Sequence, residues 1–167
     1  IIDRYTRFIA ANGIGIAGVN WNISMIPVKV LDANGTGTTA SIIAGLQYIT
    51  NLKNMWISSG GTNGANITAA NLSLGGQTFP YDTIDARAYQ MAGKAGIIIV
   101  AAAGNGTNDD GIPVNIDSTF GFPGKYSLNL PNVITVAATD NTGQLSLFSN
   151  YGAQSVQIAA PGESIWS

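Results

Sequence analysis

The sequence predicts an α/β fold: a mostly parallel, doubly wound sheet with helices on both faces. Strand-like and helix-like stretches alternate along the chain, and this order is typical of parallel sheets. Residues 97–100 are three isoleucines and a valine, apolar on both faces as a buried parallel strand requires. Glycine-marked corners follow the strands, at the ends where open α/β sheets hold their ligands.

Composition limits the class of protein. The 167 residues suit a single domain, and 46% hydrophobic with 10% charged residues exclude a disordered chain. A net charge of −2 argues against nucleic acid as a partner. No apolar run reaches the roughly 18 residues of a membrane span, and no signal peptide is expected. The chain has no cysteine and no histidine, so thiolate metal sites and the commonest general base are excluded.

The first elements are a short helix and a strand. Residues 1–11 have weak helical spacing and end at an Asn-Gly pair. Residues 13–18 match the dinucleotide spacing G-x-G-x-x-G, which we interpret as a loop because no strand precedes it and no helix follows. Residues 24–31 predict a strand, closed by a glycine-rich turn over 32–37.

A helix, a polar connection and a second strand follow. Thr38 or Thr39 can cap the helix. Its apolar stripe consists of Ile42, Leu46 and Ile49. Residues 51–65 predict a polar, glycine-rich connection, and residues 67–72 the next strand.

Asp82 or Thr83 can cap the second helix, which is predicted to run through Ala95 and to stop at Gly96, the usual residue beyond a helix end. The side chains expected to face inward are Ile84, Ala88, Met91 and Ala95. After the central strand come a long loop over 106–131 and strands at 133–138 and 156–160.

Asn105 lies at the carboxyl end of the central strand, after three alanines and a glycine. Its side chain carries two N–H donors, which could stabilise a developing oxyanion. The alternative is that Asn105 simply begins a turn, since Asn-Gly is a turn dipeptide.

Taken together and in order, the glycine corners resemble those of the subtilases, the subtilisin-like serine proteases. The resemblance covers the chain from about Asn12 to Ser167. The segments that carry it are residues 26–31, 32–37, 73–76, 101–105, 121–126, 131–138, 148–152 (Phe-Ser-Asn-Tyr-Gly) and 159–162.

The resemblance implies a substrate cleft. Asn105 matches the oxyanion asparagine of the family. The walls and floor of the pocket for the side chain before the scissile bond match Ser73, Leu74, Gly75, Gly76, Ala102, Ala103, Gly104, Gly121, Phe122 and Pro123. An edge that pairs with an extended peptide substrate matches Gly35, Thr36 and Gly37, and a second apolar subsite matches Ile42 and Leu74.

The resemblance also implies a calcium-binding loop and secretion. The calcium ligands would be Asn12 and the carbonyl oxygens of Ala10, Ile14 and Ile16, the hard oxygen atoms that this ion prefers. No organic cofactor is implied.

The catalytic residues of the family have no counterparts. Its serine lies in a Gly-Thr-Ser-Met-Ala segment beyond the one matched by residues 159–162, and its histidine lies just before the loop matched by 13–18. Its aspartate follows a still earlier strand, and Asp32 is only a turn residue. We therefore expect a fragment of a subtilisin-like serine endopeptidase, partial in its catalytic domain and inactive alone.

The same comparison leaves a gap in the sheet. The aspartate-bearing strand of the family would lie between the strands predicted at 24–31 and 67–72. Unpaired backbone groups at those edges would cost about 1–3 kcal/mol each. The missing segments of the same protease, or a second copy of the chain, would then be partners.

Two other functions stay open from sequence. One is a non-catalytic subtilase-like module that holds an extended peptide. The other is a phosphate- or nucleotide-binding α/β domain that uses the glycine corners, although it would lack a Gly-Lys-Ser/Thr loop.

Overall fold

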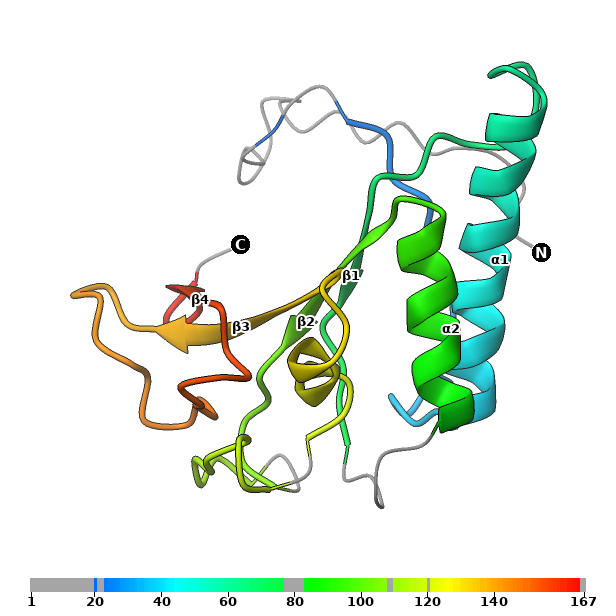
Figure 1. Cartoon of the computed structure of the whole chain (residues 1–167). Helices are drawn as coiled ribbons and strands as arrows, with labels where there is room; N and C mark the ends of the chain where they lie inside the picture. The colour runs from blue at the N-terminus through cyan, green and yellow to red at the C-terminus, as the bar shows by residue number, and fades with distance from the viewer. Residues whose placement is uncertain (1–19, 21–22, 77–82, 108–109, 120, 166–167) are drawn as a thin grey trace.

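A computed structural model describes residues 20, 23–76, 83–107, 110–119 and 121–165. Its four-stranded sheet has the order β1-β2-β3-β4, and every neighbouring pair is parallel (Figure 1). The strands are β1 Ala69–Leu72, β2 Ile98–Ala102, β3 Val133–Thr139 and β4 Ile158–Pro161. The parallel α/β fold predicted from the sequence is therefore confirmed.

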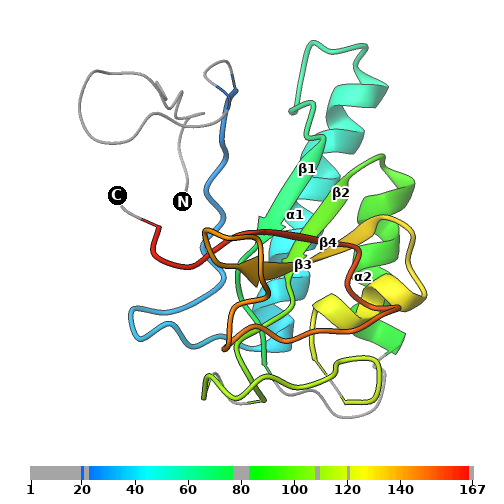
Figure 2. The same ribbon diagram turned by 90° about the vertical axis from the view of Figure 1, so that its left-hand side faces the viewer.

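The helices of the described ranges are α1 (Thr39–Ser58), α2 (Thr83–Lys94) and the 3-10 helix η1 (Gly124–Leu128). Both α-helices lie on the same side of the sheet (Figures 1 and 2), whereas the sequence predicted helices on both faces. The opposite face is half open: Ile98 of β2 is 44% exposed and Ile158 of β4 is 53% exposed. Neither α-helix combines the length and apolar character needed to cross a membrane.

Helix α1 begins as predicted at Thr38. The Thr38 hydroxyl accepts from the Ser41 N–H, and the Ser41 hydroxyl accepts from the Thr38 N–H, both at 3.1 Å. The predicted stripe of Ile42, Leu46 and Ile49 is buried in the main core.

The helix continues to Ser58, so the connection predicted over 51–65 is half helical. Lys53 lies on the buried side of this additional length of helix. Its side chain is 8% exposed, its Nζ donates to Asn66 Oδ1, and the same nitrogen lies 5.4 Å from the centre of the Trp56 ring. A lysine stem buried in this way extends the inward face past the apolar stripe.

Helix α2 ends at Lys94, and Gly96 stops it as predicted. Gly96 has a φ of +83°, its N–H donates to the Gly93 carbonyl at 2.9 Å, and the Ile97 N–H donates to the Ala92 carbonyl at 3.0 Å. These are the two hydrogen bonds of a Schellman ending, which favours glycine at this position.

The inward face of α2 differs from the predicted one. Ile84 is 72% exposed and Met91 is 44% exposed, whereas Asp85 and Tyr89 are almost fully buried. Asp85 can turn inward because the Tyr126 hydroxyl donates to its Oδ2 at 2.7 Å. Because its carboxylate has this partner, the helix buries the face that carries Asp85 and not the purely apolar face that the sequence predicted.

Residues 24–31 do not form the predicted strand. Within 23–31 the backbone has only an isolated bridge at Met25, and β1 pairs with β2 alone among the described strands. Val28 and Val30 still pack against the main core. The segment therefore keeps its apolar contacts but pairs with none of the four described strands.

We predict that Tyr126→Phe lowers the free energy of unfolding by about 1.5–3 kcal/mol, because it removes a buried hydrogen bond to a charged group. Urea unfolding followed by circular dichroism measures the change. Tyr48→Phe is the matched control, since Tyr48 is 42% exposed. Equal stability of the two variants would contradict a stabilising role for the contact between Tyr126 and Asp85.

Candidate substrate cleft

Two of the predicted pocket segments are joined directly. Gly76 and Phe122 form an antiparallel bridge, in which the Gly76 N–H donates to the Phe122 carbonyl at 3.2 Å and the reverse bond measures 3.3 Å. A Cβ on Gly75 would lie 3.0 Å from the same carbonyl. The wall over residues 73–76 therefore meets the floor over 121–123, as the resemblance implies.

The third segment lies against the same floor. Ala103 belongs to a small buried cluster with Ile116, and a Cβ on Gly121 would lie 3.2 Å from Ile116 Cγ2. A Cβ on Gly124 would lie 3.2 Å from the Ala102 carbonyl oxygen. The three segments thus gather at the carboxyl ends of β1 and β2, the lower end of the sheet in Figure 1.

An aromatic cluster supports the floor from below. The Phe122 ring stands edge-on to Tyr89 and Tyr126, with centroids 5.8 and 5.6 Å away. Burial, with the nearby charge of Asp85, raises the pKa of Tyr89, so this phenol stays neutral. The Phe122 side chain therefore packs against two aromatic rings of the core, which hold the segment in place.

Asn105 is exposed, and its side chain makes no hydrogen bond to the described residues. The turn that follows it uses its backbone, because the Gly111 N–H donates to the Asn105 carbonyl at 2.7 Å. The turn and the oxyanion role are therefore compatible: the first uses the main chain, and the second needs only the free amide group.

The predicted substrate-pairing edge is a tight turn. Asp32 Oδ1 accepts from the N–H groups of Asn34 and Thr36, at 2.8 and 2.9 Å. The Thr36 carbonyl accepts from the Asp32 N–H, so both backbone groups of Thr36 are used inside the turn. Gly35 has a φ of +75°, and the Gly37 N–H makes no hydrogen bond within the described residues. Gly37 is therefore the position that retains a donor for an added peptide strand.

The remaining predictions concern the second apolar subsite and the calcium ligands. Ile42, assigned to the second subsite, is 5% exposed and belongs to the main core, whereas Leu74 is partly exposed at the edge of that core. The predicted calcium ligands Ala10, Asn12, Ile14 and Ile16 lie outside the described residues. The calcium site stays a prediction.

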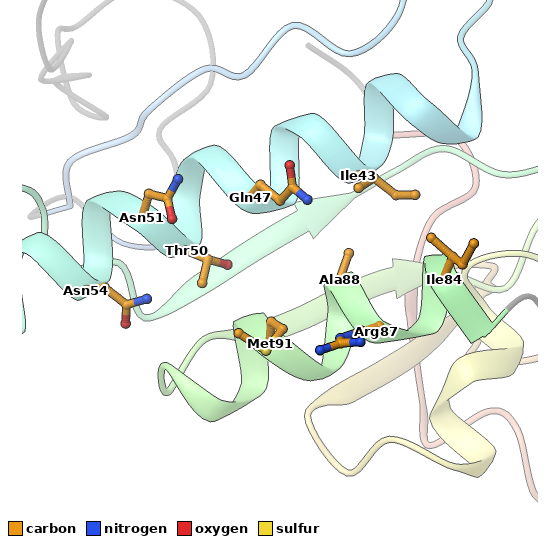
Figure 3. Close-up of a pocket in the computed structure, with 9 residues that line it drawn as sticks. All are labelled: Ile43, Gln47, Thr50, Asn51, Asn54, Ile84, Arg87, Ala88 and Met91. Atoms are coloured by element: carbon orange, nitrogen blue, oxygen red, sulfur yellow. The ribbon is translucent and has the colours of Figure 1, made fainter.

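A separate pocket of about 330 Å³ lies between α1 and α2 (Figure 3). Its lining includes Ile43, Gln47, Asn51, Ile84, Arg87 and Met91. It shares no residue with the predicted cleft. The pocket is not predicted by the sequence, in which Ile84 and Met91 have the spacing of side chains that face the core.

Asp117 ties together the two loops next to the pocket floor. Its Oδ1 accepts from the Ser155 hydroxyl at 2.6 Å and the Ser155 N–H at 2.8 Å, and a further bond comes from the Gln154 N–H. These hydrogen bonds, that of the Ser155 hydroxyl first, hold the pKa of the Asp117 carboxyl below its ordinary value.

The arrangement defines an α/β protein whose glycine-rich segments meet at the carboxyl end of a parallel sheet. Residues 7–167 match the model of the subtilase family, and the chain belongs to that family. It is 33% identical to subtilisin DY of Bacillus licheniformis over 156 residues, which are 93% of this chain and 48% of that protein. It is 36% identical to a thermostable alkaline protease of Halalkalibacterium halodurans over 154 residues, 92% of this chain and 35% of that protein.

A solved structure supports the same fold. A lanthipeptide protease superposes with a TM-score of 0.57 at 24% identity, over 81% of this chain and 37% of that one. The chain therefore spans about a third to a half of the length of these relatives.

We predict that Asp117→Asn destabilises the chain at neutral pH and that the difference fades in acid. The folded-state pKa of Asp117 is lowered from 3.8, so its stabilising contribution is present above that value. The contribution is lost as the pH falls through the lower, folded-state pKa. Urea unfolding of both proteins between pH 7 and pH 3 measures the effect, and a difference independent of pH would contradict it.

Proposed function

We propose that this chain is part of a subtilisin-like serine endopeptidase, in which it supplies the oxyanion donor and much of the substrate cleft. The proposal rests on one observation: segments 73–76, 102–104 and 121–123 meet at the carboxyl end of the sheet, where Asn105 follows Gly104 with a side chain that bonds to no described residue. Membership of the subtilase family supports the same reaction, hydrolysis of a peptide bond.

In this proposal the substrate binds as an extended strand. Its backbone pairs with Gly37, and the side chain before the scissile bond enters the pocket between Gly76 and Gly104. When a nucleophile attacks the carbonyl carbon, the carbonyl oxygen gains negative charge, and Asn105 Nδ2 donates a hydrogen bond to it. Each such bond is stronger in the transition state than in the ground state, which is the condition for catalysis.

The nucleophile and its base must come from elsewhere in the whole protein. The 167 residues contain no histidine to take the proton of a serine. We therefore propose that the triad belongs to segments outside this sequence. By family resemblance, we also propose that the whole protein is secreted. A non-catalytic peptide-binding module remains the second candidate, because the same absence of histidine is what such a module would have.

The reading frame separates these two candidates. A His-Gly-Thr-His segment just before residue 1 and a Gly-Thr-Ser segment just after residue 167 would support the protease. A frame without either segment would support the binding module.

We predict that the chain alone does not hydrolyse peptides at a useful rate. Serine proteases without their triad still accelerate hydrolysis roughly 10³–10⁴-fold over the reaction in water. This rate acceleration was measured on subtilisin itself, and we take it as an upper limit for this chain. A fluorogenic peptide measures turnover, and a fluorophosphonate label detects a serine that acts as a nucleophile. Stoichiometric labelling of one serine together with turnover would contradict the prediction.

We also predict that the pocket prefers large apolar side chains, because its glycines leave space and add no charge. A Cβ on Gly76 would meet nothing within 4 Å, so Gly76→Val should fold normally and yet narrow the pocket. We expect peptides ending in Leu or Phe to bind at least about tenfold more weakly to this variant, a loss typical of one or two blocked methylene groups.

Fluorescence polarisation of labelled peptides measures these affinities. Ala153→Val is the matched control, since Ala153 is exposed and outside the cleft. Tighter binding of peptides ending in Arg or Lys, or equal affinity of the two variants, would contradict the assignment of this pocket.

A further inference from the structure

We propose that Asn150 is a positioning residue that fixes the direction of Asn105, an inference that rests on the proposed function. Asn150 lies in the Phe-Ser-Asn-Tyr-Gly segment, 45 residues after Asn105 in the sequence. Its side chain is 3% exposed and is held inside the loop that carries Asn105.

Every hydrogen-bonding position of the Asn150 amide is used. Its Oδ1 accepts from the Gly106 N–H at 2.9 Å and from the Val114 N–H at 3.0 Å. Its Nδ2 donates to the carbonyl oxygens of Ala103 and Gly106, both at 3.0 Å. A primary amide has two donors and two acceptor lone pairs, so this network is complete.

These contacts lie on both sides of Asn105. The Asn150 main-chain N–H adds a bond to the Gly104 carbonyl at 2.9 Å, so residues 103, 104 and 106 are all bonded to one residue. Asn105 itself is the residue in this run that Asn150 leaves free. The oxyanion donor is therefore held by its neighbours and keeps its own side chain available.

The backbone around Asn105 needs such a hold. Gly104 and Gly106 have φ values of +96° and +98°, in the region that only glycine adopts easily. Two glycines give a loop many alternative conformations, and the Asn105 side chain has no bond to the described residues that would fix its direction. A catalytic donor works only when held to within about 0.5 Å, so an external clamp on the backbone is what this segment requires.

Only asparagine satisfies the site. A carboxylate of the same shape would turn an oxygen toward the Ala103 and Gly106 carbonyls, and the two donors would be lost. Serine would be too short to reach both sides of the loop. Asn150→Asp therefore removes the donors at constant volume, and Asn150→Ser truncates the clamp without adding charge.

The first test is amide hydrogen exchange in the ¹⁵N-labelled chain. We expect the Gly106 and Val114 N–H groups to exchange at least about tenfold faster in Asn150→Ser, because each N–H donates to Asn150 Oδ1 and serine removes this acceptor. Asn150→Asp keeps an acceptor oxygen there and loses only the two donors, so we expect a smaller rise in exchange at the same two N–H groups. The Ile99 N–H, which donates to the Asn132 carbonyl inside the sheet, reports global opening. Asn141→Asp, at an exposed turn, is the matched control.

Two outcomes of this test would overturn the proposal. Unchanged exchange at Gly106 would mean that Asn150 does not hold the loop. An equal rise at Gly106 and Ile99 would mean that the substitution only destabilises the fold as a whole.

The second test measures whether the hydrogen bonds of Asn150 are needed for binding of an anionic group beside Asn105. The probes are two peptides with the same Leu side chain at the end, one closed by a phosphonate and one by a neutral amide. We expect the wild-type chain to prefer the phosphonate. Asn150→Ser should lose that preference, with a larger loss of affinity for the phosphonate than for the amide peptide. A merely structural change in the pocket would weaken both peptides equally and would overturn the proposal, as would an unchanged preference.

The two tests separate this inference from the proposed function. If the wild-type chain binds neither peptide, the proposed cleft is wrong. The exchange measurement then still decides whether Asn150 fixes the Asn105 segment.

Discussion

Parallel pairing of β1 with β2 is the constraint on which the rest of the structure depends. Leu72 stands opposite Ala101, so the two strands end at nearly the same level of the sheet. The glycine segments that follow them must then leave the sheet together, and the Phe122 segment can bond to one of them while its ring rests on Tyr89 and Tyr126. The meeting of these segments thus depends on the register of the two strands: a shift of one strand would separate the segments even with every side chain unchanged.

Much of the fold could be predicted from the sequence, because its signals are local. The threonine cap of α1, the glycine end of α2 and the β-branched runs of the sheet each act within a few residues. The errors arose where a distant partner overrode the local pattern. Asp85 faces the core, where it accepts a hydrogen bond from Tyr126. The Lys53 side chain is buried in the additional length of α1, where it donates to Asn66 and lies near the ring of Trp56. Residues 24–31 have the pattern of a strand, but a strand also needs a neighbour.

The candidate site divides in the same way. Its segments could be identified because each carries glycines at a fixed distance from a strand, and the resemblance to subtilases connected them. The contacts that join them could not be identified. The network of Asn150 spans more than forty residues, and that of Asp117 joins two loops through backbone N–H groups, which leave no mark in a sequence. Asn150 belongs to residues 148–152, which match the family, but the sequence predicted no role for its side chain.

The hydrogen bond from Gly106 to Asn150 also bears on chemical ageing. Asparagine followed by glycine is the pair most prone to deamidation, because the glycine nitrogen can attack the asparagine side chain and close a succinimide ring. Here the Gly106 N–H is donated to Asn150 Oδ1, and the hydrogen bonds of Asn150 to residues 103, 104 and 106 hold the backbone on either side of Asn105. A nitrogen engaged in this way is a poor nucleophile. The hydrogen bonds of Asn150 therefore disfavour deamidation of Asn105. A molecule that lost this amide would have a negative charge in place of a hydrogen-bond donor, at the position where the proposed function requires a negative charge to be stabilised.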